Sequence, residues 1–335
     1  MFNTIMLAVN KPNIEELVLQ QHSKFNSQNF VKPMYGDNVN LTPNDNDYLK
    51  EPKRRTTREY ADEVYKHAIF KVNINTEEIY MFKNTYYEKI SEPNFRRYIN
   101  LICDTNGMTL HNPRLIEDIC SYIKKDYRPA ISDCRNNSKY VAFQDKILDL
   151  DTMAIYDGNP GIFLTWCLNC KFNEYFRMND FQIKNAVPMP ANFCSFINTI
   201  ANYQESLIQR IWQSIGLLFT NDVACKKIIL FQGVGNSGKS KLAEFIKSLM
   251  SDGCVSELTF ADLGEKFSLS IIPGKHMICS MDLPFLPISD QSASKLKSIT
   301  SGGSDEISVE PKYQPKYTYK PEIQCLFGTN HKVQF

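Results

Sequence analysis

Residues 227–250 read KIILFQGVGNSGKSKLAEFIKSLM, and this stretch decides the fold. Its first part, Lys227 to Phe231, is a short apolar run typical of a buried parallel strand. Four apolar residues of its last part fall on one helical face: Leu242, Phe245, Ile246 and Leu249. The sequence therefore predicts a strand, a glycine-rich loop and a helix in direct succession.

The loop between strand and helix matches the phosphate-binding pattern G-x-x-x-x-G-K-S. Glycines let the backbone turn tightly, so that its N–H groups and the helix N-terminus point at anionic phosphate. Lys239 would reach the β- and γ-phosphates, and Ser240 would hold Mg²⁺. A chance glycine-rich turn is disfavoured by the flanking strand and helix. We expect ATP and Mg²⁺ as cofactors, held by Gly233, Val234, Gly235, Asn236, Ser237, Gly238, Lys239 and Ser240.

Composition and charge exclude several classes of protein. The 335 residues are 43% hydrophobic and 22% charged, which is typical of a globular rather than a disordered chain. The formal net charge is +1, so any nucleic-acid surface must be a local patch. No apolar run is long enough to cross a bilayer, and the N-terminus lacks the features of a signal peptide. We expect a cytoplasmic protein without a membrane partner, in the host cytoplasm if a phage or virus encodes it.

The ten cysteines are expected to be free thiols. They are scattered without the spacing of a disulfide framework, and Cys279 and Cys325 lie in apolar, strand-like runs. Cys167 and Cys170 form a C-x-x-C motif. No second C-x-x-C and no H-x-x-x-H accompanies it, which disfavours a zinc site.

Three regions are predicted along the chain. Residues 1–64 are polar and rich in Asn and Pro, which predicts a flexible or poorly packed segment; its basic cluster at 53–58 either contacts phosphate or is simply solvated. Residues 65–220 mix strand-like and helical stretches, including a hairpin around Lys83 and Asn84, and predict a mixed α/β domain. Residues 221–335 are the predicted ATPase core.

A helix is predicted over residues 193–219, with a break near Tyr203, leading into that core. Its second half carries an apolar stripe that we expect to be buried: Leu207, Ile211, Ile215 and Leu218.

Residues 276–282, HMICSMD, form an apolar run that ends in a carboxylate. A second core strand of this kind can deliver Asp282 toward Mg²⁺ and water. Many such ATPases carry two adjacent acids at this point, whereas Leu283 follows here. The catalytic base therefore stays open between Asp282 itself and an acid from elsewhere.

Two further segments lie downstream. Residues 307–309 and 317–319 can pair as a hairpin whose tip would carry Lys312, Tyr313 and Lys316. Such a tip suits single-stranded DNA, although a solvated surface hairpin is an equal alternative. The last apolar run ends at Asn330, whose amide either orients water beside the γ-phosphate or is an ordinary turn residue.

The order GVGNSGKS, SMDLP, KLKSITSGGSDEISVEPKY and CLFGTN resembles superfamily 3 helicases, among them the phage, plasmid and poxvirus-type primase-helicases. The resemblance covers roughly residues 65–335. It implies an AAA+-type P-loop ATPase core with a parallel sheet, preceded by a mixed α/β domain. It also implies a homo-hexameric ring around single-stranded DNA, with ATP between subunits. Asp282 would then be the acid at Mg²⁺, Asn330 the sensor, and the Lys312 to Lys316 hairpin the element that grips DNA.

The chain departs from this family after Arg210, because no arginine occurs between there and Phe335. The family uses an arginine finger from a neighbouring subunit, which can be worth ~10³ or more in rate. Lys332 cannot make the bidentate contact of a guanidinium. We expect a core cut short after Asn330: a fragment, a chain completed by another polypeptide, or a protein that binds ATP without efficient turnover.

The sequence thus predicts an ATP-dependent DNA helicase or translocase of a phage, plasmid or viral replication system. No upstream acid cluster predicts a primase site, so a primase or other replisome proteins are candidate partners. The first alternative is an ATP- and DNA-binding replication module, or a truncated remnant, without efficient hydrolysis. The second is a small-molecule kinase, which the hairpin and the absence of a recognisable lid disfavour.

Overall fold

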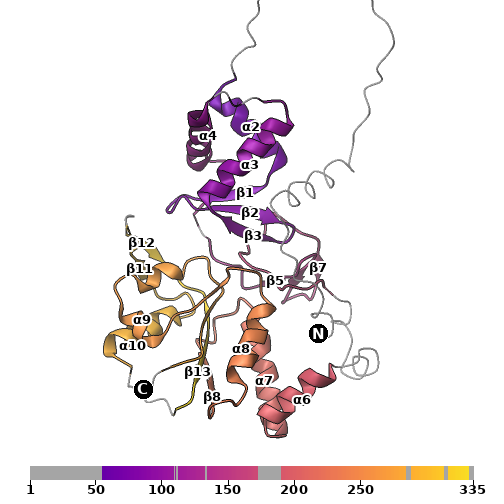
Figure 1. Ribbon diagram of the computed structural model, residues 1–335, viewed down its shortest axis with the longest axis vertical. Helices are drawn as coiled ribbons and strands as arrows, with labels where there is room; N and C mark the ends of the chain where they lie inside the picture. Colours follow the sequence, from indigo (N-terminus) through magenta and orange to yellow (C-terminus); the bar gives the residue numbers. More distant parts are fainter. Residues whose placement is uncertain are drawn as a thin grey trace, which may run out of the picture. The chain divides into compact units, whose positions relative to one another are not determined.

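The computed structural model describes residues 55–108, 110, 112–132, 134–172, 190–283, 288–312 and 316–331 (Figure 1). The described chain forms two compact units, one of residues 55–69 and 91–130 and the other of residues 70–90 and 131–331. The second unit contains every predicted site residue that the structure describes. Tyr313 of the predicted hairpin tip lies outside the described residues, and the predicted boundaries at residues 65 and 221 stay predictions.

The first unit consists of helices α2 (Thr57–His67), α3 (Glu92–Thr105) and α4 (Pro113–Lys125). The stretches predicted as helical near 94–103 and 113–124 are confirmed. Helix α2 begins inside the segment that was expected to be poorly packed. A capping box explains its start, because the Thr56 side chain accepts from the Glu59 N–H and the Glu59 carboxylate accepts from the Thr56 N–H.

Two small sheets belong to the second unit, except that Ala130 of β4 falls in the first unit. One has the order β3-β2-β1-β4 and the other β5-β6-β7. Their strands are β1 (Phe70–Asn73), β2 (Ile79–Lys83), β3 (Tyr86–Ile90), β4 (Ala130–Ile131), β5 (Tyr140–Ala142), β6 (Ile147–Asp149) and β7 (Ile155–Tyr156). The pairs β1–β2, β2–β3, β5–β6 and β6–β7 are antiparallel. The predicted hairpin at Lys83 and Asn84 is confirmed as the turn between β2 and β3.

Helices α6 (Ala191–Ile200) and α7 (Glu205–Leu218) confirm the predicted helix and its break. Between them Asn202 and Tyr203 have φ values of 49° and 57°, which end α6 in a left-handed turn. The predicted burial of Leu207 is wrong, since its side chain is 38% exposed and Ile208 packs against the core instead. The buried face of α7 therefore starts at Ile208 rather than at Leu207, one residue later than the apolar stripe in the sequence.

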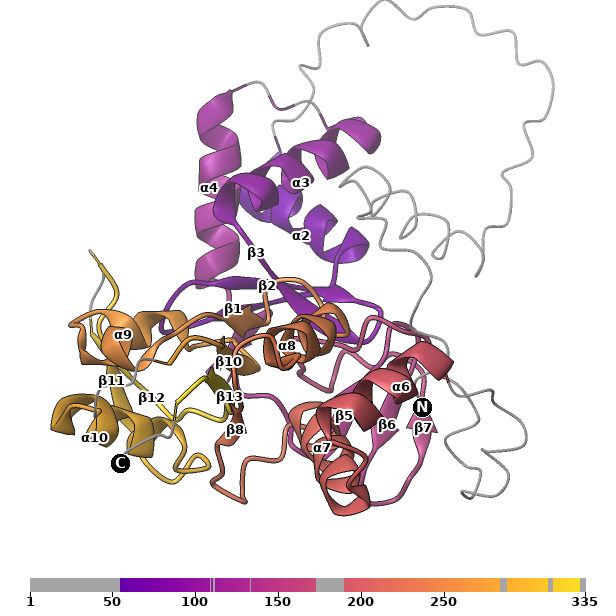
Figure 2. The same ribbon diagram turned by 60° about the horizontal axis from the view of Figure 1, so that its bottom comes forward.

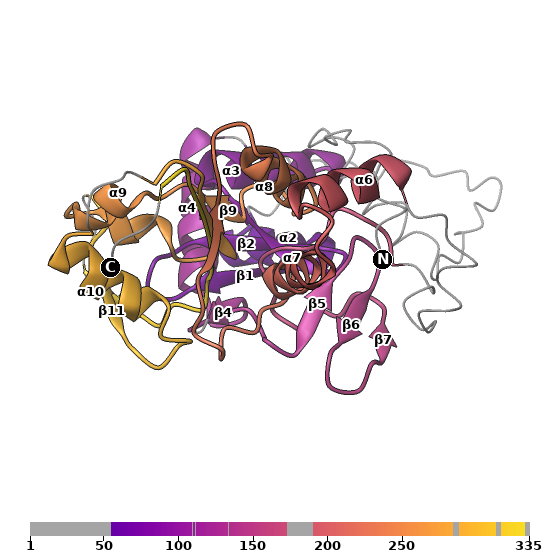
Figure 3. The same cartoon turned by 90° about the horizontal axis from the view of Figure 1, so that it is seen from below.

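The central element is a parallel sheet with strand order β8-β13-β10-β9. Its strands are β8 (Ile229–Gln232), β9 (Val255–Ser256), β10 (Met277–Ser280) and β13 (Gln324–Thr329). Around it lie α8 (Lys239–Ser248), α9 (Phe260–Gly264), the short helix η2 (Ser268–Ile271), α10 (Asp290–Ile299), and the hairpin of β11 (Ile307–Val309) and β12 (Tyr317–Tyr319). Figures 1 and 3 show α7 and α8 on one side of the sheet and α9 and α10 on the other.

Two hydrophobic cores cover the two faces of this sheet. Successive strand residues point to opposite faces, so Met277 and Cys279 join the core under α7 and α8, while Ile278 joins the core under α9 and α10. On β13, Leu326 and Phe327 divide in the same way. The expected fold class, an α/β protein with a P-loop core on a parallel sheet, is confirmed. Within the described residues no helix is both long and apolar enough to span a membrane.

Candidate nucleotide-binding site

Residues 233–238 connect β8 to α8, and Lys239 and Ser240 are the first two residues of the helix, in the order strand, loop, helix that the sequence predicts. Gly238 is the N-cap residue of α8 and has φ of 90°, a left-handed conformation that glycine adopts without steric cost. The Lys239 ammonium group donates to the carbonyls of Gly233 at 2.8 Å and Val234 at 2.9 Å, and to Ser237 Oγ at 3.1 Å. The loop therefore encloses a cation next to the N-terminus of a helix, an arrangement that attracts phosphate.

Helix α6 packs directly on this loop, a contact that sequence reasoning missed. A Cβ added at Gly238 would lie 2.8 Å from Cγ2 of Ile200 and 3.0 Å from the ring of Phe196. Figures 2 and 3 show α6 alongside α8. The sequence offers a helix with apolar residues but no sign of which loop it would touch.

The strand order brings the other predicted residues to the edge of the sheet that carries the loop. Asp282 follows β10 and Asn330 follows β13, and both side chains are exposed. Strand β13 lies between β8 and β10. Asn330 therefore follows the middle strand, while Lys239 lies beyond the end of β8 and Asp282 beyond the end of β10. The carboxyl edge of a parallel sheet is where ligands bind in α/β folds.

The ends of β10 and β13 are held together closely at this edge. The Leu283 N–H donates to the Gly328 carbonyl at 3.0 Å, and the Thr329 hydroxyl donates to the Leu283 carbonyl at 3.3 Å. Leu283 is only 4% exposed. The residue after Asp282 is thus a core residue. Thr329, which was not predicted from the sequence, holds the backbone of Leu283 through its hydroxyl group.

The predicted hairpin is confirmed as β11 and β12, with Ile307 opposite Tyr319 and Val309 opposite Tyr317. Lys312 is exposed near the tip, with its ammonium nitrogen 5.9 Å from the centre of the Phe267 ring. Lys316 is also exposed and lies 3.5 Å from a carboxylate oxygen of Glu310. The charge of Lys316 is therefore partly neutralised by Glu310, whereas Lys312 lies beside an aromatic ring.

All ten cysteines are free thiols, and Cys167 is buried. Burial raises the pKa of Cys170 to about 11, so this thiol is protonated at neutral pH. No cluster of three or more potential metal-binding side chains (His, Cys, Asp or Glu) occurs in the described ranges.

Comparison with known proteins extends the fold assignment. A family of unknown function (DUF5906) matches residues 231–335, the part of the chain from β8 onward. No curated protein matches the chain.

Solved structures provide a more complete comparison. The apo structure of the NrS-1 C-terminal region is 14% identical, with a TM-score of 0.50, and the match covers 81% of this chain and 56% of that one. The A form of the same region is 14% identical with a TM-score of 0.48, covering 82% and 57%. JCV helicase bound to a thiazolopyridine compound is 19% identical with a TM-score of 0.28, covering 44% and 42%. The first likeness shows a shared fold, over a little more than half the length of the NrS-1 region.

Proposed function

We propose that this chain binds ATP and Mg²⁺ at the Gly233 to Ser240 loop and acts as an ATP-dependent DNA helicase or translocase. It would serve the replication of a phage, plasmid or virus in the host cytoplasm. The resemblance to superfamily 3 helicases supports a homo-hexameric ring on single-stranded DNA, with a primase or other replisome proteins as further partners.

The observation that carries this proposal is the strand order β8-β13-β10. It brings the lysine of the glycine-rich loop, an amide and a carboxylate to one edge of one sheet from three separate parts of the chain. Lys239 would bind the β- and γ-phosphates, Ser240 and Asp282 would hold Mg²⁺, and Asn330 would orient the attacking water. A triphosphate would draw the Lys239 ammonium group away from the carbonyls that it contacts.

A second candidate function is ATP and DNA binding without efficient hydrolysis. It is favoured by Leu283, which is buried where a second acid would otherwise stand beside Asp282.

Nucleotide binding and ATPase assays on three proteins distinguish these possibilities. Lys239→Ala removes the ammonium group from the loop, whereas Lys241→Ala removes an exposed lysine two residues away that pairs with Glu244 at 2.8 Å. We expect the wild type and Lys241→Ala to bind ATP and to hydrolyse it faster with single-stranded DNA, and Lys239→Ala to do neither. ATP binding by the wild type without turnover would establish the second candidate. Equal ATP binding by the wild type and Lys239→Ala would contradict both.

A further inference from the structure

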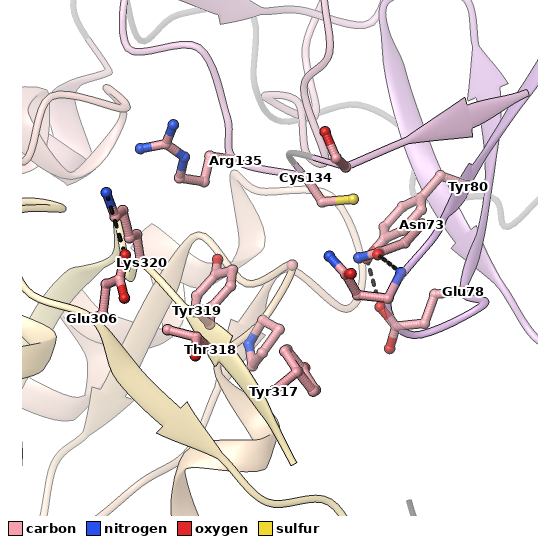
Figure 4. Close-up of a pocket in the computed structure, with 14 residues that line it drawn as sticks. Asn73, Glu78, Tyr80, Cys134, Arg135, Glu306, Tyr317, Thr318, Tyr319 and Lys320 are labelled. Atoms are coloured by element: carbon pink, nitrogen blue, oxygen red, sulfur yellow. Dashed lines mark hydrogen bonds and ion pairs between the residues drawn. The ribbon is translucent and has the colours of Figure 1, made fainter. Parts of the chain in front are cut away.

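A cavity of about 270 Å³ lies in the second unit, away from the candidate nucleotide site (Figure 4). Residues of the β1–β2 turn and of strand β12 line this cavity from opposite sides in Figure 4, and Gly274 also lines it. Gly274 precedes β10, so the cavity lies near the amino edge of the parallel sheet, whereas the phosphate-binding loop follows the carboxyl end of β8. The two sites are therefore distinct.

The charged side chains of the cavity do not select an ion. Each is already paired: Arg135 with Glu322 at 3.1 Å, Lys320 with Glu306 at 3.6 Å, and Glu78 with Lys89. An ion of either sign would therefore meet an attractive and a repulsive charge side by side in each pair. A neutral ligand with hydrogen-bonding groups would not.

Asn73 provides a hydrogen-bonding group in this cavity. Its side chain is 9% exposed, and its Oδ1 accepts from the N–H groups of Asn75 at 2.8 Å and Thr76 at 3.4 Å. These bonds fix the orientation of the amide. Among the residues that the structure describes, no protein acceptor is found for its Nδ2, and this atom is not fully buried, so it can donate to a ligand in the cavity that Asn73 lines. A ligand carbonyl would satisfy it.

The remaining walls are aromatic. Tyr80, Tyr317 and Tyr319 line the cavity, and Figure 4 shows Tyr317 and Tyr319 across from Tyr80. Burial raises the pKa of Tyr317 to about 12 and those of Tyr80 and Tyr319 further. All three phenols are therefore neutral at physiological pH. Pockets for drug-sized ligands measure about 300–1,000 Å³, so this smaller cavity suits a ligand with about one ring system.

We propose that this cavity binds one unpaired nucleobase of a single DNA strand that runs along the β11–β12 hairpin. A nucleobase is planar and neutral and carries both donors and acceptors, which matches the aromatic walls and the Asn73 amide. Strand β12 contributes residues 317–320 to the cavity and leads directly from the hairpin tip. This proposal rests on the proposed function, because the pocket can receive a base only if single-stranded DNA binds along the hairpin.

The test compares two fluorescent 12-mers, oligo-dT and an abasic strand of equal length, in anisotropy titrations of the full chain. The decisive variant is Asn73→Asp, which keeps the Oδ1 acceptor of the turn and replaces the Nδ2 donor by a charged oxygen. Its matched control is Asn100→Asp, which introduces the same charge at an exposed position of α3. Thermal melting of each protein checks that the fold is intact.

We expect the wild type to bind oligo-dT about tenfold or more tightly than the abasic strand. Asn73→Asp should reduce this ratio to about threefold or less, while Asn100→Asp should leave it at the wild-type value. An equal affinity of the wild type for both strands, or an unchanged ratio in Asn73→Asp, would overturn the base pocket. Failure of the wild type to bind either strand would instead contradict the proposed DNA function, on which the pocket depends.

Discussion

The imidazole of His276 stacks on the indole of Trp166, with ring centroids 3.7 Å apart. His276 Nε2 donates to the Leu218 carbonyl at 2.6 Å, and Trp166 Nε1 donates to Asn221 Oδ1 at 2.7 Å. His276 directly precedes β10, whereas Trp166 belongs to the chain before the phosphate-binding loop. The pair therefore anchors the central sheet to the segment that precedes it.

The first prediction concerns stability against pH. Burial lowers the pKa of His276 from its ordinary value of 6.5 to about 4. Below pH 6.5 the unfolded chain gains a proton that the folded chain does not accept, so the free energy of unfolding should fall as the pH drops from 6.5 to 4. Over this interval the loss is at most about 3 kcal/mol, at 1.36 kcal/mol per pH unit. Urea unfolding at several pH values measures it.

The variant His276→Gln isolates this contribution from other titrating groups. It removes the ring and should be less stable than the wild type at pH 7.5, because the stacking on Trp166 is lost. Between pH 6.5 and 4 its stability should fall less steeply than that of the wild type. Parallel curves for the two proteins would show that His276 is not the group responsible.

The second prediction compares two glycines of the phosphate-binding loop. Gly238→Ala places a Cβ against Ile200 and Phe196 at φ of 90°, so it should destabilise the protein by about 1–3 kcal/mol and weaken ATP binding. Gly235→Ala meets no atom within 4 Å and should change stability by less than about 0.5 kcal/mol. Thermal unfolding with and without ATP tests both, and a Gly238→Ala protein as stable as Gly235→Ala would contradict the contact with α6.

The third prediction concerns the edge of the sheet at Asp282. A Cβ at Gly328 would lie 2.8 Å from Sδ and 3.2 Å from both Cα and the carbonyl oxygen of Met281. The backbone of Met281 cannot move without moving its neighbour Asp282, so Gly328→Ala should lower both stability and the Mg²⁺-dependent part of ATP affinity. Titration with ATP in Mg²⁺ and in EDTA separates the two effects.

Gly216→Ala is a control for which we expect the free energy of unfolding to rise rather than fall. It lies inside α7, and an added Cβ meets nothing within 4 Å. Gly216→Ala should therefore stabilise the protein by about 0.5–1 kcal/mol through helix propensity. Destabilisation by this change would contradict the open space described around α7.

The fourth prediction concerns the hairpin tip. If Lys312 contacts a DNA phosphate, Lys312→Ala should weaken DNA binding for every sequence and reduce the slope of log K against log salt by about 1. Lys297→Ala, an exposed lysine on α10, should leave the slope unchanged. Equal slopes for wild type and Lys312→Ala would exclude this contact.

Much of the local structure was predictable because its signals are local. The strand before Gly233, the helix after Ser240 and the hairpin around residues 307–319 follow from apolar spacing within a few residues. The exposure of Leu207 was not predictable, because Leu207 and Ile208 lie four and three residues before Ile211 and either spacing continues the apolar face of Ile211, Ile215 and Leu218. Which stripe is buried depends on the position of the neighbouring sheet.

The sequence by itself determined the strand, the glycine-rich loop and the helix around Gly233 to Ser240, since glycine conformations, a lysine and a helix start are properties of a single continuous segment. It also placed Asp282 and Asn330 at strand ends. Only the tertiary structure decided that β13 lies between β8 and β10, that α6 packs against Gly238, and that Asn73 shares a cavity with Tyr319. These relationships join residues far apart in the chain, and they arise from the packing of two cores on one sheet rather than from the conformational preference of any one segment.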